Sequence, residues 1–404
     1  MKIIVQKFGG TSVATPEARE AVVKKVKGAL EQGFKPVVVV SAMGRKGQPY
    51  ATDTLIGVLK AANVSPHLHE MDLLMSCGEI ISSCVMAATL QANDINSRAL
   101  TGGQAGMVTD AEFGVAKIKR IDTKNLFNLL EEDVVPVICG FQGVTEESGD
   151  ITTLGRGGSD TSAAAFGAAL KADMVEIYTD VDGIMTADPR IVDDAKIMKQ
   201  ISYGEICEMA HQGAKVIHPR AVEIAMRNNV PMVVKSTFSD APGTLISSQS
   251  AYVKGEITIG EHIASGIAHL TGLAQFKVTL DPKDSANGKA LFAKLAEGGV
   301  SIGSLNLQPE LTMFAVYTPD IAKTEEILKQ TNYQYELNKD CAKVSVVGAG
   351  MGGVPGVMST FVAALANKNI TILQTMDSDA TISAIISEKY VSEAVNALHE
   401  AFKL

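Results

Sequence analysis

The stretch IIVQKFGGTS (residues 3–12) is the most informative guide to the fold of the first half of the chain. A strand-like apolar run ends in two adjacent glycines, and Thr11 and Ser12 follow where a helix can begin. Adjacent glycines let backbone N–H groups approach an anion closely, and a helix N-terminus adds positive potential. Lys7 places a mobile positive charge beside this turn, which suits a phosphate group. Taken alone, a plain Gly-Gly turn followed by a Thr or Ser cap explains the segment more simply.

Outward from this segment, strand-like runs alternate with small-residue helices. Such alternation predicts an α/β fold with a mostly parallel central sheet and helices on both faces. The stretch 239–261 contains Pro, Gly and Ser and no long periodic segment, so we place the first domain at 1–245 and a linker at 246–262. The strand-like runs are 3–8, 36–43, 134–141 and 174–180, and the helical segments include 16–32 and 162–172.

The tail contains a weak internal repeat, in which 277–307 and 343–375 both run strand, loop, helix, turn, strand. Each copy continues with another strand and helix, which predicts two βαββαβ units at 263–342 and 343–404. Neither unit shows a row of acid–base or nucleophilic residues. The tail is therefore expected to serve binding or assembly.

A second glycine loop, TTLGRGGSDTSAAA (152–165), precedes an alanine-rich helix. Arg156 offers a bidentate grip on a carboxylate or phosphate, and Ser159 can add a hydrogen bond. A carboxylate beside an anion site is repelled, so Asp160 is expected to have a specific role there, such as orienting Lys7 or contacting a substrate ammonium. Helix capping by the Asp and Thr side chains is the simpler alternative. Two glycine loops in one domain are more specific than either alone.

A third segment, YTDVDGIMTADPR (178–190), follows a predicted strand, where ligands bind in open α/β sheets. Thr179 and Asp180 are its candidate ligand contacts, although Asp182 and Gly183 fit an ordinary turn. Lys215 in GAKVIHPR (213–220) adds a cation, for which a solvated surface lysine is the simpler explanation.

The composition excludes several functional classes. A chain of 404 residues with a net charge of −9 argues against nucleic acid or an anionic membrane as the main partner. No stretch approaches 18 apolar residues and no signal peptide is evident, so we expect a cytoplasmic protein without a membrane span. The five cysteines lack metal-ligand spacing and are expected to be reduced, buried thiols. No metal ligands are predicted.

Familiar nucleotide and hydrolase motifs are absent. GxxxxGK[ST], the protein-kinase motifs and HExxH do not occur. GAGMGG (348–353) matches GxGxxG, but only about 50 residues remain after it, too few for a dinucleotide domain. It also falls inside the tail repeat, so we set it aside.

Taken together, the motifs closely resemble the aspartate kinase family. KFGGTS, SAMG (41–44), MDLLMSCGE (71–79), GFQG (140–143), the two segments at 152–165 and 178–190, and GAKVIHPRA occur in that family's order, and the tail resembles its paired ACT domains. The resemblance implies an amino-acid-kinase fold and phosphoryl transfer from ATP, with Mg²⁺, to L-aspartate, giving 4-phospho-L-aspartate. This reaction opens the route to lysine, threonine, methionine and diaminopimelate.

The resemblance also implies roles for individual residues. Lys7 and Asp160 are the expected catalytic pair. The transferring phosphate would be held by Lys7, Phe8, Gly9, Gly10 and Ser41, the aspartate by Thr52, Glu79, Arg156, Gly157, Gly158 and Ser159, and the nucleotide by Thr179, Asp180, Met185, Thr186, Ala187, Asp188, Pro189, Arg190 and Lys215. An ionised carboxylate attacks without a general base, so the site has to neutralise charge. No acidic cage is visible, and Mg²⁺ is expected to be held mainly by the ATP phosphates.

The tail departs from the pattern of lysine- or threonine-inhibited relatives at 304–314 and 373–383. It looks more like the diaminopimelate-regulated type, which favours meso-diaminopimelate as effector, with lysine or threonine as alternatives. ACT units commonly pair across chains, so a homo-oligomer is expected. Polar groups expected at an ACT interface are Asn306, Gln308, Gln374, Asp377 and Ser378.

Two other functions remain open on the sequence. The nearest is a glutamate, acetylglutamate or uridylate kinase of the same fold, although such relatives generally lack both the ACT-like tail and MDLLMSCGE. The other is a catalytically silent amino-acid sensor, against which the intact Lys7, Glu79, Arg156 and Asp160 argue.

Overall fold

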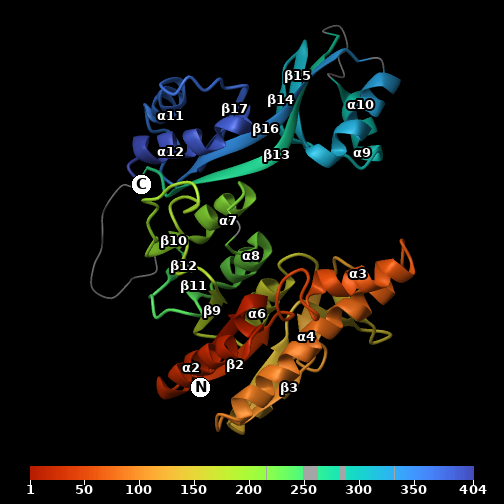
Figure 1. Cartoon of the computed structure of the whole chain (residues 1–404), viewed down its shortest axis with the longest axis vertical. Coiled ribbons are helices and arrows are strands. Elements are labelled where there is room, and N and C mark those ends of the chain that lie inside the picture. Colours follow the sequence, from red (N-terminus) through yellow and green to blue (C-terminus); the bar gives the residue numbers. More distant parts are fainter. Residues whose placement is uncertain (215, 249–262, 282–287, 332) are drawn as a thin grey trace. The chain divides into compact units, whose positions relative to one another are not determined.

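The computed structural model describes residues 1–214, 216–248, 263–281, 288–331 and 333–404 (Figure 1). These residues form two compact units. The first unit comprises 1–184, 197–207 and 216–248, and the second comprises 185–196, 208–214 and the described residues from 263 onward. The domain boundary near residue 245 stays a prediction, because most of the expected linker lies outside the described residues.

The first unit is built on an eight-stranded sheet with the order β10-β12-β11-β9-β1-β2-β6-β3. The neighbouring pairs from β11 to β3 are all parallel, while β12 runs antiparallel to β11. A mostly parallel sheet is thus confirmed. The strands are β1 (Ile3–Phe8), β2 (Lys35–Val40), β3 (Ser97–Leu100), β6 (Val135–Cys139), β9 (Met174–Thr179), β10 (Gln200–Ser202), β11 (Met232–Ser236) and β12 (Thr244–Ser247).

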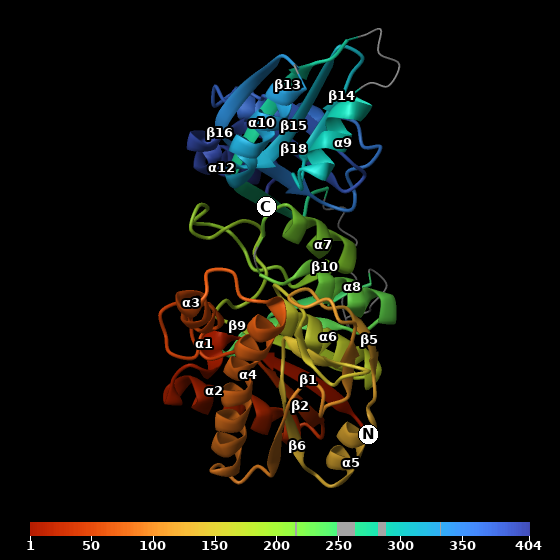
Figure 2. The same cartoon turned by 90° about the vertical axis from the view of Figure 1, so that its right-hand side faces the viewer.

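Helices cover both faces of this sheet. Alternate residues of a strand face opposite sides, and Phe8, Val38 and Val40 share a core with apolar residues of α2 and α4 on one face. Figure 2 shows α2 and α4 beside each other, and α6 contacts the sheet and α8. The helices are α1 (Gly10–Val13), α2 (Pro16–Glu31), α3 (Thr52–Ala62), α4 (Leu68–Gln91), α5 (Lys124–Glu131), α6 (Gly158–Ala169), α7 (Tyr203–His211) and α8 (Pro219–Asn228).

A small second sheet, not anticipated from the sequence, lies within the first unit. Its order is β5-β4-β7-β8, and α4 contacts β8. Its strands of three or four residues are too short to give a clear alternating pattern. They are β4 (Met107–Thr109), β5 (Ile118–Ile121), β7 (Gln142–Thr145) and β8 (Ile151–Thr153).

In length and apolar composition, helix α4 resembles a membrane-spanning helix more than the sequence analysis predicted. Within the described part of the chain it is the one helix long and apolar enough, by length and composition, to cross a bilayer. Half of its most apolar window is buried inside the structure, and Asp72 and Glu79 on it are buried as well. We therefore interpret α4 as a core helix.

The second unit is a six-stranded antiparallel sheet with the order β14-β15-β13-β16-β18-β17. Two long strands, β13 and β16, run side by side through both ACT-like halves (Figure 1). The elements are β13 (Gly266–Thr279), α9 (Lys289–Glu297), β14 (Gly303–Leu307), β15 (Leu311–Tyr317), α10 (Ile321–Gln330), β16 (Tyr335–Val347), α11 (Val357–Ala366), β17 (Gln374–Asp377), β18 (Thr381–Ser387) and α12 (Val391–Ala401), with single 3₁₀ turns at Thr318–Asp320 and Glu388–Tyr390.

The order of the second ACT-like half differs from the expected consecutive βαββαβ repeat. The half ends in α12 without a final strand. Its fourth strand comes from the start of β13, where Gly266 to Leu270 pair with the end of β16. The strand precedes the first repeat, so comparing 277–307 with 343–375 could not reveal it.

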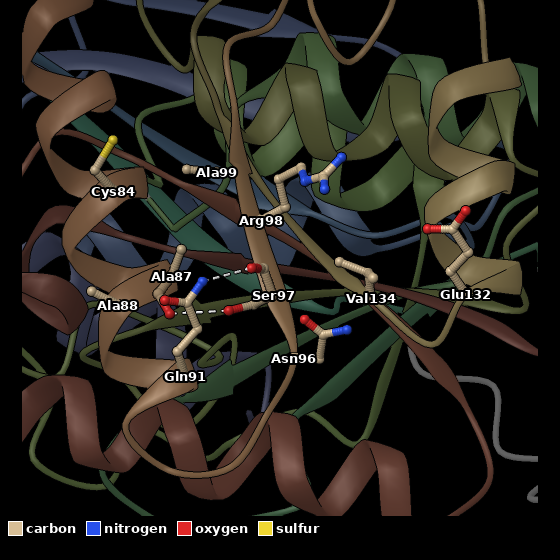
Figure 3. Close-up of a pocket in the computed structure, with 10 residues that line it drawn as sticks. All are labelled: Cys84, Ala87, Ala88, Gln91, Asn96, Ser97, Arg98, Ala99, Glu132 and Val134. Carbon is tan, nitrogen blue, oxygen red and sulfur yellow. Dashed lines mark hydrogen bonds between the residues drawn. The ribbon is translucent and has the colours of Figure 1, made fainter.

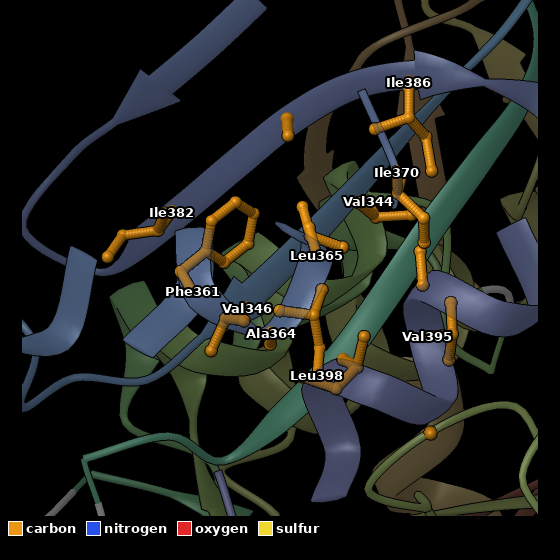
Figure 4. Close-up of a cluster of buried hydrophobic side chains, with 14 of the residues drawn as sticks. Val344, Val346, Phe361, Ala364, Leu365, Ile370, Ile382, Ile386, Val395 and Leu398 are labelled. Carbon is orange, nitrogen blue, oxygen red and sulfur yellow. The ribbon is translucent and has the colours of Figure 1, made fainter. Parts of the chain in front are cut away.

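Apolar side chains hold this half together. Val344 and Val346 of β16 lie against Phe361 and Leu365 of α11 and Leu398 of α12 (Figure 4). Ala187 and Val192 belong to the same cluster, which explains why 185–196 forms part of the second unit.

The five cysteines are all free thiols, as expected. Their burial was only partly anticipated. Cys139 and Cys341 are buried, but Cys77 and Cys207 are half-buried and Cys84 is exposed.

Candidate active site

The carboxyl ends of four neighbouring parallel strands bring the predicted loops of the first unit together. Gly9 and Gly10 follow β1, Ser41 follows β2, Gly140 follows β6 and Asp180 follows β9. This edge is where open α/β sheets bind ligands. The backbone connects two of the loops, since Gly44 N donates to Gly10 O at 2.9 Å.

Lys7 and Asp160 form an ion pair at this edge. Lys7 lies on the sheet face opposite to Phe8, and its Nζ is 2.7 Å from Asp160 Oδ1 in the first turn of α6. Their side chains are only 11% and 14% exposed. A Cβ on Gly9 would lie 3.7 Å from Lys7 Nζ, so glycine leaves the space beside the ammonium open. The ammonium is thus held in position beside the glycine turn.

Glu79 supplies a buried carboxylate with spare bonding capacity. Its Oε1 accepts from Ala42 N at 3.0 Å, while its Oε2 has no hydrogen-bond partner among the described residues. Burial raises the pKa of Glu79 to about 8, and the bond from Ala42 opposes this only in part. Gly78 makes the contact possible, because a Cβ there would lie 2.8 Å from Ala42 Cβ and 2.9 Å from Tyr50 O. A buried oxygen without a partner is costly unless a ligand supplies a donor.

The Gly155–Gly158 loop leads into α6 and presents Arg156 to solvent. Gly157 has φ +67°, and a Cβ there would lie 2.2 Å from the His218 ring, so only glycine fits. Ser159 lies in the first turn of α6 against Gly140, where an added Cβ would approach the Ser159 side chain to 2.8 Å. The N-cap residue of α6 is Gly157, which has no side chain to bond the first turn, and this leaves N-terminal N–H groups for an anion.

On the other side of β1, Thr179 ends β9 and Asp180 follows it. Thr179 Oγ1 donates to Asp180 Oδ1 at 3.1 Å, and Arg45 Nη2 contacts Asp180 Oδ2 at 2.5 Å. Arg45 could not be selected from the sequence, because a lone arginine in a loop belongs to no recognisable motif. Its guanidinium adds positive charge at this edge.

Beneath the glycine turn, a buried polar network ties β1 to β9 and β11. Phe8 is fully buried and stacks on Tyr178 with 4.7 Å between ring centroids, so its side chain is a core residue. Glu176 accepts from Tyr178 Oη and Gln6 Nε2, both at 2.9 Å, and from Lys235 Nζ at 2.7 Å. Burial raises the pKa of Tyr178, so its hydroxyl stays a donor. This network joins three neighbouring strands of the sheet beneath the glycine turn.

Two further residues that the sequence left unassigned fix the Arg156 loop. Asp72, in the quoted MDLLMSCGE segment, accepts hydrogen bonds from Thr153, and Arg220 donates to Leu154 O. For Asp72, the only indication in the sequence was an acidic residue within an apolar helix, and this does not show which residue it contacts.

Six of the remaining predicted nucleotide contacts are not part of the first unit. Met185 to Arg190 belong to the second unit, where Thr186 Oγ1 lies 2.9 Å from His399 Nε2. Arg190 pairs with Asp188 at 2.7 Å and holds the pKa of that carboxyl below its usual value. Lys215 lies outside the described residues. The roles of these residues in nucleotide binding stay predictions.

The predicted effector residues all belong to the second unit, but they differ in burial and in their contacts. Gln374 is buried, and its amide accepts from Gln275 Nε2 at 2.9 Å and donates to Ser304 O. Ser378 Oγ lies 2.9 Å from Thr381 Oγ1 on an exposed turn. Asn306 is half-buried, whereas Gln308 and Asp377 are exposed. Their part in effector binding stays a prediction.

A pocket of about 590 Å³ lies elsewhere, beside the edge strand β3 (Figure 3). It contains none of the predicted site residues, and part of its wall is fixed by the Gln91 Nε2 bond to Ser97 O at 2.8 Å. Over the described ranges, no group of three or more His, Cys, Asp or Glu side chains could hold a metal ion.

Comparisons with known proteins agree with this architecture. The profile of the Amino acid kinase family matches residues 2–236, and that of an ACT domain matches residues 336–400. Aspartokinase 1 of Bacillus subtilis is 47% identical over 404 residues, covering all of both chains, and the aspartokinase of Geobacillus stearothermophilus is 40% identical, covering all of this chain and 98% of its own.

Solved structures show the same fold. Aspartokinase III of E. coli, in complex with aspartate and ADP, has a TM-score of 0.81 at 24% identity and full coverage of both chains. The aspartate kinase of Clostridium acetobutylicum has a TM-score of 0.78 at 23% identity, covering 99% of this chain and all of its own. The full-length identity to curated aspartokinases extends the likeness beyond the fold: the chain belongs to the amino acid kinase family and, within it, to the aspartokinases.

Proposed function

We propose that the first unit transfers the γ-phosphoryl group of ATP to the side-chain carboxylate of L-aspartate, giving 4-phospho-L-aspartate and ADP. The observation that carries the proposal is Glu79, a buried carboxylate whose Oε2 has no partner among the described residues. An amino-acid ammonium supplies the missing donors and the missing positive charge.

The site binds both the α-carboxylate and the α-ammonium of the substrate. The exposed Arg156 guanidinium binds the α-carboxylate through two parallel hydrogen bonds. Glu79 pairs with the α-ammonium. Thr52 is assigned to the same aspartate site: it begins α3, two residues after Tyr50, whose carbonyl oxygen lies beside Gly78. Holding both groups orients the side-chain carboxylate for in-line attack.

Phosphoryl transfer then depends on neutralising charge. Two anions approach each other, and the aspartate carboxylate is already ionised at pH 7, so no general base is needed. Lys7, fixed by Asp160, lies beside the phosphate as negative charge spreads over its oxygens. Amides of the glycine turn and the N-terminus of α6 add further positive potential.

The residues present fit ATP with Mg²⁺ held by the phosphates. Space beside Lys7 is kept open by Gly9, and no cluster of acidic ligands occurs in the described part of the chain. Mg²⁺ supplies charge neutralisation on the phosphate oxygens when bound. Thr179, Asp180, 185–190 and Lys215 are assigned to the nucleotide.

The second unit is assigned a regulatory role. Its ACT-like halves are proposed to bind an amino-acid effector, with meso-diaminopimelate favoured over lysine or threonine, and to pair with a second copy of the chain. A cytoplasmic location fits a biosynthetic kinase of this kind.

The deciding experiment measures ADP release from Mg·ATP with L-aspartate, and separately with L-glutamate, acetylglutamate and uridylate. Aspartate-dependent release supports the proposal, while release with another acceptor alone replaces the substrate within the same fold. Repeating the assay with lysine, threonine, both together and meso-diaminopimelate identifies the effector. Inhibition by lysine or threonine would keep the enzyme and refute the effector assignment.

A further inference from the structure

Asp72 is a fully buried carboxylate on α4 that the proposed chemistry does not use. Its Oδ2 accepts from Thr153 N at 2.7 Å and from Gly114 N at 2.9 Å, and its Oδ1 accepts from Thr153 Oγ1 at 2.8 Å. No Lys, Arg or His of the described residues forms an ion pair with it. Hydrogen bonds to a buried charge are strong, so Thr153 is held firmly against α4.

The positions of these two residues connect the two halves of the amino-acid site. Asp72 and Glu79 are separated by about two helical turns and therefore share one face of α4. Thr153 ends β8 just before the loop that carries Arg156. The Asp72–Thr153 contact therefore joins the helix of the ammonium-binding residue to the strand that leads to the carboxylate-binding residue.

Arg220 secures the same strand end from another direction. Its Nη1 donates to Leu154 O at 2.9 Å and its Nη2 to Ala116 O at 3.0 Å, while Ala116 N donates to Thr153 O at 2.9 Å. The chain is thus fixed up to Leu154, and Arg156 follows after a single glycine.

We infer that Asp72 is a positioning residue which, through Thr153, sets the separation of Glu79 and Arg156. This separation determines how the α-carbon is held and hence how far the side-chain carboxylate reaches toward the phosphate. The contact therefore contributes to the choice of aspartate over glutamate, which is one methylene longer. The inference rests on the proposed function of the site.

The test compares two neighbouring threonines of β8. Thr153→Val removes the hydroxyl bonded to Asp72 but keeps the backbone bond, whereas Thr152→Val removes an equally buried hydroxyl that lies 2.6 Å from Thr109 Oγ1. We expect Thr153→Val to raise the KM for aspartate about threefold to tenfold, with the KM for ATP within about twofold. The preference for aspartate over glutamate in kcat/KM should fall as well. Thr152→Val should leave all of these unchanged.

Asp72→Asn should have the larger effect, about tenfold or more in the KM for aspartate. If this variant fails to fold in thermal unfolding, Thr153→Val decides alone. In an Arg156→Lys background, Thr153→Val should add little, because both changes act on the same guanidinium.

Three results overturn the inference: an unchanged KM for aspartate in Thr153→Val, an equal effect of Thr152→Val, or full additivity with Arg156→Lys. If Arg156→Lys by itself leaves the KM for aspartate unchanged, the assignment of the amino-acid site fails first.

Discussion

Lys7 Nζ lies 2.7 Å from Asp160 Oδ1 where β1 ends and α6 begins. A second lysine–aspartate pair, Lys35 with Asp133, involves the neighbouring strand β2 but is more exposed. Both are lysine–aspartate ion pairs, but only the first lies at the proposed active site. The second pair is therefore a matched control for the first.

Replacement of Lys7 by Ala should lower kcat by at least about 10²-fold, because the transition state loses a fixed positive charge. The measurement is ADP release at saturating ATP and aspartate. Lys35→Ala should change kcat by less than about twofold. Unchanged turnover in Lys7→Ala would remove the phosphate role of this residue.

Asp160→Asn should lower kcat by about tenfold to 10²-fold, because Lys7 loses the charge that orients it. The KM for aspartate should change little, since the amide keeps the shape of the side chain. Asp133→Asn, which removes the partner of Lys35, is the control. A rise in the KM for aspartate with constant kcat would instead place Asp160 on the substrate.

Glu79 should make aspartate binding depend on pH. Its pKa is raised to about 8, so the free carboxyl is mostly protonated at pH 7, and only the ionised form pairs with an ammonium. The KM for aspartate should therefore fall about tenfold between pH 6 and 7 and about fivefold between pH 7 and 8. Titration calorimetry at pH 7 in buffers of different ionisation enthalpy should detect release of close to one proton per site.

Glu79→Gln should abolish both the proton release and the slope, and raise the KM for aspartate at pH 8 by about tenfold or more. Glu131→Gln, an equal charge change at an exposed position at the end of α5, should preserve both signals. A pH-independent KM in the unaltered protein would contradict the assigned pairing.

Gln374→Leu should destabilise the second unit by about 1–3 kcal/mol, because Gln275 Nε2 loses the closer of its two acceptors and keeps only Leu373 O at 3.5 Å. Thr375→Val, at an exposed position of the same strand, should stay within about 0.5 kcal/mol. Denaturant unfolding followed by circular dichroism measures both. Equal stability of the two variants would mean that water replaces the Gln374 contact.

Local patterns were sufficient to predict much of the fold. The apolar runs 3–8, 36–43, 134–141 and 174–180 became β1, β2, β6 and β9, because buried parallel strands need continuous apolar residues. The short strands of the second sheet and the shared fourth strand of the last ACT-like half were missed. Which strands pair depends on segments that are far apart in the chain, and a local hydrophobic pattern contains no information about them.

From the residues alone, the two glycine loops, Lys7, Arg156 and Asp160 could be predicted as parts of a ligand site, and the family resemblance added Glu79 within an apolar helix. These predictions were possible because the conformational freedom of glycine and the charge of a side chain follow from residue type. Tertiary structure was needed to show that Lys7 pairs with Asp160 and that one oxygen of Glu79 has no partner among the described residues. Burial and hydrogen bonding are set by residues brought together from distant positions, and a linear pattern does not contain them.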